Sequence, residues 1–306
     1  MLKSLEIRIT SKCNSRCLIC HIWKAPAGRD ASLGQYKKLF SHPEFKSVEE
    51  IFISGGEPFC RSDLKRIVLG ILKLLPRVNK FFLTTNGTFS EKAADLFREL
   101  NRNKKITSLR LGVSLEGNRQ ITKKIRGIDS YNSALETLAL CQKNASRLQT
   151  RILATLTKLN CDKKSLSHLL ALAKKTGSAF SFRPFYNCEF CHYNYSINLS
   201  PTKKQKELAA GFIDQNLSFD PFLAAQAKYL RTGKMPLMDR CLAGKAFADV
   251  RQDGSVYACL NSSRQIGSPE KGIYVKKISD LGQQEPCPCC DEGCFYPVYN
   301  KNYAEK

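Results

Sequence analysis

Three cysteines near the start of the chain constrain its fold and chemistry more than any other feature. Cys13, Cys17 and Cys20 are separated by three and then two residues, and they follow the strand-like run Leu5–Ile9. A loop with this spacing can place three thiolates around one 4Fe–4S cluster, which normally takes four cysteine ligands. With three ligands, one iron keeps an open position that can bind a small molecule. The alternative for this spacing alone is a structural zinc loop, because zinc sites also use closely spaced cysteine pairs.

The spacing resembles the signature of the radical S-adenosylmethionine (SAM) superfamily. The resemblance implies that these three cysteines hold a 4Fe–4S cluster whose open iron binds the amino and carboxylate groups of SAM. It also implies that an electron from the cluster cleaves the sulfonium, and that the resulting 5′-deoxyadenosyl radical takes a hydrogen atom from the substrate. The sequence assigns no catalytic residue to that hydrogen transfer.

The first two-thirds of the chain alternates between strand and helix patterns. The expected strands are 5–10, 50–54, 80–85, 108–114, 151–157 and 179–184, and the expected helices are 33–41, 63–75, 91–101, 131–143 and 164–175. Ser90 and Asp162 are the expected N-caps of the helices 91–101 and 164–175. Such alternation predicts an α/β fold with a parallel sheet and helices on its outer face. It matches the partial (β/α)6 TIM-like barrel of the resembled superfamily. Active sites in such barrels lie at the C-terminal ends of the strands.

A glycine pair follows the second expected strand. Gly55 and Gly56 let the backbone approach a ligand closely, and Glu57 can accept a hydrogen bond. Gly-Gly alone would be an ordinary turn, but this stretch resembles the superfamily's GGEP box, whose backbone binds the amino group of SAM. After the third strand, Asn86 belongs to a Thr-Asn-Gly stretch that faces the cofactor pocket in the family. Asn-Gly is also a common turn dipeptide.

The fourth expected strand ends at Ser114, and Arg126 lies shortly after it. This region is similar to the Ser-Leu-Asp-Gly and Arg-Gly pattern of the subgroup with C-terminal auxiliary clusters. The resemblance implies that Ser114 contacts the ribose of SAM and that Arg126 lies near the cofactor or the substrate carboxylate. One departure is that Thr122-Lys123 replaces the subgroup's His-Asp, so no role of that Asp transfers. Lys123 would favour an anionic substrate or be a solvated helix residue.

Cysteines outside these motifs receive weaker assignments. Cys188 and Cys191 form a C-x2-C pair that could ligate a metal, act as a redox dithiol or be loop residues, and nearby Arg183 could hold an anionic group. Isolated cysteines such as Cys60 usually behave as small hydrophobic residues of the core, so Cys60 is assigned no role. Two helices, about 202–216 and 221–231, are expected to follow, with Ser200 as an N-cap.

The tail carries a second cysteine constellation. The spacing of Cys241, Gly254 and Cys259 resembles the opening of SPASM and twitch domains. A hairpin is expected over 247–256, with its turn at Asp253-Gly254. The resemblance implies one auxiliary 4Fe–4S cluster, which fits a small cysteine-rich, twitch-like domain. Its candidate ligands are Cys241, Cys259, Cys287, Cys290 and Cys294, and the choice among Cys287, Cys289, Cys290 and Cys294 stays open. A zinc knuckle is the alternative. We place the barrel core in 1–200 and the linker helices with the auxiliary domain in 201–306.

Composition limits the partners and the compartment. The 306 residues carry 49 basic and 27 acidic side chains, which gives a formal charge of +22. The sequence has no apolar run long enough to span a membrane and no leader-like segment. We therefore expect a cytoplasmic protein. The charge favours an acidic partner or reflects solvated lysine-rich faces, with nucleic acid a less favoured partner than a small molecule.

The sequence as a whole predicts a radical SAM enzyme of the oxidoreductase type. The expected reaction is oxidation, dehydrogenation or cross-linking of a small anionic metabolite, such as a sugar, a cyclitol or a nucleotide-linked compound, with help from the auxiliary cluster. Modification of a peptide or protein is the second interpretation. An external electron donor such as flavodoxin or ferredoxin is also implied. A non-enzymatic zinc or iron–sulfur protein for binding or electron transfer is the alternative from another class.

Overall fold

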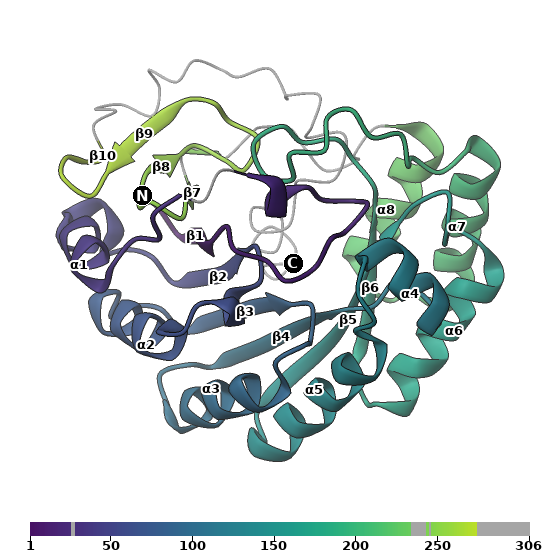
Figure 1. The fold of residues 1–306 in the computed structure, drawn as a ribbon, viewed down its shortest axis with the longest axis horizontal. Coiled ribbons are helices and arrows are strands. Elements are labelled where there is room, and N and C mark those ends of the chain that lie inside the picture. Colours follow the sequence, from purple (N-terminus) through teal and green to yellow (C-terminus); the bar gives the residue numbers. More distant parts are fainter. Residues whose placement is uncertain (26–27, 234–242, 245, 274–306) are drawn as a thin grey trace.

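The structure is a computed structural model that describes residues 1–25, 28–233, 243–244 and 246–273. The strands in this part of the chain form a single sheet in the order β10-β9-β8-β7-β1-β2-β3-β4-β5-β6. Figure 1 shows the sheet curving around an open centre. The strands are β1 (Ser4–Thr10), β2 (Glu50–Gly55), β3 (Lys80–Thr85), β4 (Ser108–Ser114), β5 (Leu148–Leu156), β6 (Ala179–Pro184), β7 (Phe247–Val250), β8 (Val256–Tyr257), β9 (Gln265–Ser268) and β10 (Gly272–Ile273).

Helices cover the outer, convex face of the sheet (Figure 1). Strands β1 to β6 pair in parallel, each with the next, as successive strand–helix–strand units require. The α-helices in the described part are α1 (Leu33–Ser41), α2 (Leu64–Leu74), α3 (Ser90–Arg102), α4 (Arg119–Arg126), α5 (Tyr131–Asn144), α6 (Lys163–Lys175), α7 (Lys203–Asn216) and α8 (Pro221–Thr232). The predicted α/β fold with a partial TIM-like barrel is confirmed.

The main hydrophobic core lies between the sheet and these helices. Ile7 and Ile9 of β1 and Phe81 of β3 are completely buried against helix residues such as Leu39 and Phe97. Apolar side chains on one face of each strand meet the apolar stripe of each helix, and this burial is the main stabilising term of the fold. The opposite, concave face of the sheet is left to line the interior of the barrel.

The sequence located most elements up to α8 to within a few residues, with two errors in the helix N-caps and one α-helix omitted. Asp162 caps α6 as its spacing suggests, accepting from Ser165 N. Ser90, expected as a cap, is the first residue of α3. Ser200 is not a cap either, because the Thr202 side chain accepts from Gln205 N and starts α7 two residues later. The short helix α4 was not predicted, since half of its residues are charged.

The strands after α8 continue the same sheet. β7 pairs in parallel with β1, and the expected hairpin is present as the antiparallel pair β7 and β8, with Gly254 at a φ of 88° in the turn. β9 and β10, which continue this edge of the sheet in antiparallel pairs, were not predicted. The boundary near residue 200 falls between β6 and α7 and stays a prediction. Cys241, Cys287, Cys289, Cys290 and Cys294 lie outside the described residues.

Within the described residues, no helix has both the length and the apolar character needed to cross a membrane.

Candidate active site

The C-terminal ends of the strands surround a cavity of about 250 Å³. All three cysteines of the N-terminal loop line it. Its walls also include every cofactor residue expected from the sequence, namely Gly55, Gly56, Glu57, Asn86, Ser114 and Arg126. The fold therefore brings together motifs that are spread over more than a hundred positions of the chain.

The cysteine loop is held in place by the end of helix α4. The backbone N–H of Arg16 donates to the carbonyl of Arg126 at 3.0 Å, and that of Leu18 donates to Ile125 at 2.8 Å. Gly127 ends α4 in the left-handed region at a φ of 70°. A Cβ atom there would lie 2.4 Å from the Arg16 carbonyl oxygen, so the loop approaches the helix end as closely as glycine allows.

The three thiols share a mostly desolvated environment. Burial raises the pKa of Cys13 to about 11 and that of Cys20 to about 12, and it also raises the pKa of Cys17. Metal coordination would lower the pKa of these thiols again, because a metal binds the deprotonated thiolate. Across the described residues, no three potential ligands converge on a point that a single metal ion could occupy. Three thiols that line one cavity are the donor set that an iron–sulfur cube takes, with one thiolate on each of three irons.

The glycine pair at the end of β2 packs against the start of the cysteine loop. A Cβ atom on Gly55 would lie 2.3 Å from the Thr10 oxygen, and one on Gly56 would lie 2.2 Å from the Lys12 oxygen. The N–H groups of Gly56 and Glu57 donate to these same two carbonyls at 2.7 and 2.8 Å. Because these donors are used within the protein, a ligand at this edge would meet backbone acceptors, which suit an amino group.

Glu57 is a buried connector between β2 and β3. Its carboxylate accepts from Phe59 N at 3.1 Å, Thr85 Oγ1 at 2.8 Å and Asn86 N at 2.7 Å. Burial raises its pKa to about 7, and these three hydrogen bonds limit the increase. The sequence identified an acceptor at this position, but the groups that donate to it belong to the protein.

Asn86 joins the end of β3 to the cysteine loop. Its Nδ2 donates to Asn14 Oδ1 at 2.7 Å and to Ser15 Oγ at 2.8 Å. Its Oδ1 accepts from both the N–H and the hydroxyl of Thr88. The side chain, which is 6% exposed, therefore positions the residues that follow Cys13.

Arg126 reaches back from α4 toward both a cysteine and a carboxylate. Its Nη1 lies 3.8 Å from Cys17 Sγ, and its Nη2 pairs with Glu116 Oε1 at 2.7 Å. Burial alone would lower the pKa of Arg126, but attraction to Glu116 and Cys17 outweighs it and the pKa is raised. Ser114, at the end of β4, lines the cavity beside this pair. Lys123 is exposed on α4, which agrees with a solvated helix residue.

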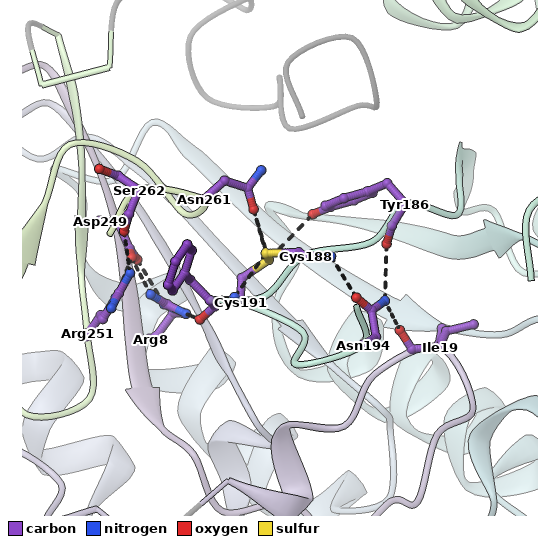
Figure 2. Close-up of a disulfide and its surroundings, with 11 residues drawn as sticks. Arg8, Ile19, Tyr186, Cys188, Cys191, Asn194, Asp249, Arg251, Asn261 and Ser262 are labelled. Atoms are coloured by element: carbon purple, nitrogen blue, oxygen red, sulfur yellow. Dashed lines mark hydrogen bonds and ion pairs between the residues drawn. A yellow bond between two sulfur atoms is a disulfide. The ribbon is translucent and has the colours of Figure 1, made fainter. Parts of the chain in front are cut away.

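A loop after β6 closes one side of the cavity and contains a disulfide between Cys188 and Cys191 (Figure 2). The Cys191 N–H donates to Cys188 Sγ at 3.0 Å, and Asn261 Oδ1 contacts both sulfur atoms. Asn194 fixes the loop by donating to the carbonyl of Ile19 at 2.8 Å, next to Cys20. The structure joins the two sulfurs as a disulfide, which is the oxidised form of the dithiol considered from the sequence, and a redox role stays a prediction.

Charged side chains project from the strands into the barrel interior. Arg8 of β1 donates to Asp249 of β7 through Nε at 3.0 Å and through Nη2, and it also donates to the Phe190 carbonyl (Figure 2). Glu6, two residues earlier, accepts a hydrogen bond from Ser54 Oγ. Burial raises the pKa of Glu6 to about 7. Neither Glu6 nor Arg8 was singled out from the sequence, although charges at alternating positions of a buried strand are a usable signal.

A family model described as the radical SAM superfamily matches residues 7–159 of the chain. The chain belongs to the radical SAM superfamily. Membership makes it an enzyme, which removes the non-enzymatic alternative, and it implies a 4Fe–4S cluster and SAM as cofactors. The matched segment contains the cysteine loop, the glycine pair and the ends of β3 and β4.

Several curated relatives of this radical SAM enzyme are named "Probable GTP 3',8-cyclase". A protein of Methanocaldococcus jannaschii named "Probable GTP 3',8-cyclase" is 26% identical over 240 residues, which cover 76% of this chain and 74% of the relative. A protein of the same name from Saccharolobus islandicus is 32% identical over 139 residues, covering 44% of this chain and 42% of the relative.

Solved structures share the fold at lower identity. SuiB from Streptococcus suis, bound to SAM, superposes with a TM-score of 0.65 at 13% identity and covers 96% of this chain and 68% of SuiB. A structure titled "Native anSMEcpe with bound AdoMet" has a TM-score of 0.65 at 17% identity, covering 90% of this chain and 79% of that protein. These likenesses support the architecture of the radical SAM barrel and leave the substrate open.

Proposed function

We propose that Cys13, Cys17 and Cys20 hold the 4Fe–4S cluster of this radical SAM enzyme and that the cavity beside them binds SAM. The observation that carries the proposal is the convergence of these three thiols on one cavity with the glycine pair and Ser114. When bound, the cluster and SAM supply the 5′-deoxyadenosyl radical that abstracts hydrogen from the substrate. An external donor such as flavodoxin or ferredoxin would provide the reducing electron.

The residues of the chain have distinct parts in this proposal. The carbonyls of the glycine pair would accept hydrogen bonds from the SAM amino group, since the adjacent N–H groups already donate to Thr10 and Lys12. Ser114 would contact the ribose. Arg126, next to Cys17 Sγ, would stabilise the negative charge of the ligated thiolate. Glu57 and Asn86 would hold the backbone around the cluster loop rather than touch SAM.

We further propose that the substrate is a small anionic metabolite, and guanosine triphosphate (GTP) is the first compound to test. Support comes from the relatives named for a reaction of GTP and from the charge of +22. A peptide substrate remains the second candidate, since SuiB and its precursor peptide have been solved together on this fold.

The auxiliary cluster stays part of the proposal. Cys259 is a half-buried cysteine in the described part of the chain, directly after the β7–β8 hairpin. We propose it as one ligand, together with Cys241, Cys287 and Cys290 or Cys294, of a cluster in the domain that follows residue 200. Such a cluster would take up an electron in an oxidation of the substrate. Cys259→Ala should remove about four irons per chain and leave the first cluster in place.

Incubation with GTP tests the reaction directly. The anaerobically reconstituted protein is given dithionite and SAM, with and without GTP, and 5′-deoxyadenosine and nucleotide products are quantified. Faster formation of 5′-deoxyadenosine with loss of GTP supports the nucleotide substrate. Formation of 5′-deoxyadenosine with GTP unchanged would keep the radical SAM assignment and reject GTP.

A further inference from the structure

The cysteine loop has an outer face as well as the face that lines the cavity. Burial alternates along its centre: Cys17 and Ile19 are only 6% and 7% exposed, whereas Arg16 is exposed and Leu18 is 40% exposed. Cys17 and Ile19 line the cavity, and Arg16 and Leu18 are not among the described residues that do so. Alternate side chains therefore point toward the proposed cluster site and toward solvent.

An aromatic ring holds two cations at this outer face. The guanidinium carbon of Arg16 lies 5.0 Å from the centre of the Trp23 ring, and Lys24 Nζ lies 5.0 Å from the centre of the same ring. Such cation–π contacts favour a fixed position of the charge next to the ring. Arg16 Nη1 also donates to the carbonyl of Cys13 at 2.9 Å. The charge of Arg16 is therefore held directly against the loop that carries the thiols.

The last turn of α4 adds two more cations. Lys123 and Lys124 are exposed there, directly before the two residues whose carbonyls accept from the N–H groups of Arg16 and Leu18. In the part of the chain that the structure describes, neither these two lysines nor Arg16 and Lys24 form an ion pair. The carboxylate that follows α4 is already paired with another arginine, at 2.8 Å. The four cations are therefore available to an acidic partner.

We call Arg16, Leu18, Lys24, Lys123 and Lys124 the outer basic face. An exposed apolar side chain among unpaired charges is typical of a transient protein interface, in which apolar contact excludes water and the charges steer the approach. A partner bound here would meet the loop on the side opposite the cavity. Because electron transfer slows steeply with distance, this position next to the thiol-bearing loop suits a partner that delivers an electron.

We propose that the outer basic face is the docking surface for a small acidic electron-transfer protein of the flavodoxin or ferredoxin type. The proposal rests on the cluster site and the external donor proposed above. One electron passes from the reduced donor to the oxidised cluster, and no bond forms or breaks in this step. Since the donor binds outside the cavity, it does not compete with SAM or substrate.

Charge reversal at two lysines tests the docking surface. Lys24→Glu/Lys124→Glu leaves Arg16 and its bond to the cysteine loop in place. 5′-Deoxyadenosine formation is measured with flavodoxin, kept reduced by its reductase and NADPH, and separately with dithionite, which needs no docking site. At low salt the KM for flavodoxin should rise roughly 10-fold or more, because each change replaces an attraction by a repulsion. The rate with dithionite should stay unchanged.

A matched variant controls for the change in net charge. Lys104→Glu/Lys105→Glu makes the same change at two exposed lysines before β4, at the end of the strands opposite the cysteine loop. It should match the wild type with both reductants. Calorimetric titration of each holoenzyme with oxidised flavodoxin gives the affinity without turnover, and it should fall roughly 10-fold in Lys24→Glu/Lys124→Glu alone. Iron analysis shows that each variant carries its cluster.

The outcomes distinguish this inference from the function on which it rests. An unchanged KM and affinity for flavodoxin in Lys24→Glu/Lys124→Glu, or equal losses in both double variants, would overturn the docking surface and leave the cluster site standing. A wild type that cleaves SAM with dithionite but binds neither flavodoxin nor a ferredoxin would overturn the acidic donor. Binding of an RNA oligonucleotide in its place would assign this face to nucleic acid. No cleavage with dithionite at full iron content would overturn the proposed function itself.

Discussion

At the scale of single residues, the site depends on buried polar side chains that connect strand ends to the cysteine loop. Glu57 holds the backbone at the end of β3, and Asn86 continues the connection to Asn14 and Ser15. Removing one partner from a buried hydrogen-bonded network leaves the others unsatisfied, at a cost of about 1–3 kcal/mol. These residues therefore organise the cluster loop without needing to touch the cofactor.

Asn86→Ala tests this positioning role. The variant should lower the free energy of unfolding by about 1–3 kcal/mol and reduce the iron retained after reconstitution, because it loses both bonds to the loop. Asn144→Ala is the matched control, since Asn144 bonds to Arg98 on the surface at the end of α5. Urea titration and iron analysis measure the two effects. Full iron content in Asn86→Ala would show that the loop is ordered without this side chain.

At the scale of elements, helix α4 acts as a support for the cysteine loop. Two backbone hydrogen bonds connect its last turn to Arg16 and Leu18, and Gly127 permits the close contact. The sequence resemblance implied only that Arg126 lies near the cofactor or the substrate carboxylate. The structure adds that the end of the same helix contacts the loop that carries the three thiols.

Gly127→Ala should therefore be more damaging than an equivalent change elsewhere. It combines left-handed backbone strain with a clash against the Arg16 carbonyl, for a total cost of about 2–4 kcal/mol and loss of iron. Gly177→Ala is the control, since Gly177 has a φ of 63° but no atom within 4 Å of the added Cβ. It should cost about 1–2 kcal/mol with normal iron content. Equal costs in urea unfolding would show that the contact with Arg16 is unimportant.

At the scale of the whole molecule, the net positive charge contrasts with the ion pairs at the active-site cavity. The chain carries a formal charge of +22, yet Arg8 and Arg126, which line the cavity, are each paired with a buried carboxylate. Long-range attraction by the surface would speed the arrival of an anion, while selection inside the cavity would depend on short-range hydrogen bonds.

Salt should separate these two contributions. Raising ionic strength shortens the Debye length to about 10 Å at 0.1 M, so the KM for an anionic substrate should increase with salt. The KM for SAM, which is not an anion, should not increase and is the internal control. Steady-state rates at 0.05 to 0.5 M salt, a range of about tenfold, provide the measurement. A flat response for the anionic substrate would indicate that the basic residues are only solvated surface.

Local patterns in the sequence were sufficient for most of the fold and for the motifs around the cavity. Strands such as 80–85 and 108–114 were located without error because turn residues bound them and their apolar content is high. Contacts between distant segments were not accessible in this way. Thr85 and Asn86, which donate to Glu57, come from the end of β3, and the contact of Glu6 with Ser54 depends on the alignment of β1 beside β2. Tertiary pairing, which no local pattern encodes, brings them together.

The most direct test of the central claim is 5′-deoxyadenosine formation by single cysteine variants. Wild type, Cys13→Ala, Cys17→Ala, Cys20→Ala and the nearby control Cys60→Ala are reconstituted anaerobically, analysed for iron, and incubated with dithionite and SAM. We expect cleavage by the wild type and by Cys60→Ala, and none by the three loop variants, each of which should also retain about four fewer irons. Cleavage retained in any loop variant, or lost in Cys60→Ala with full iron, would contradict the assignment of the three-cysteine loop as the cluster site.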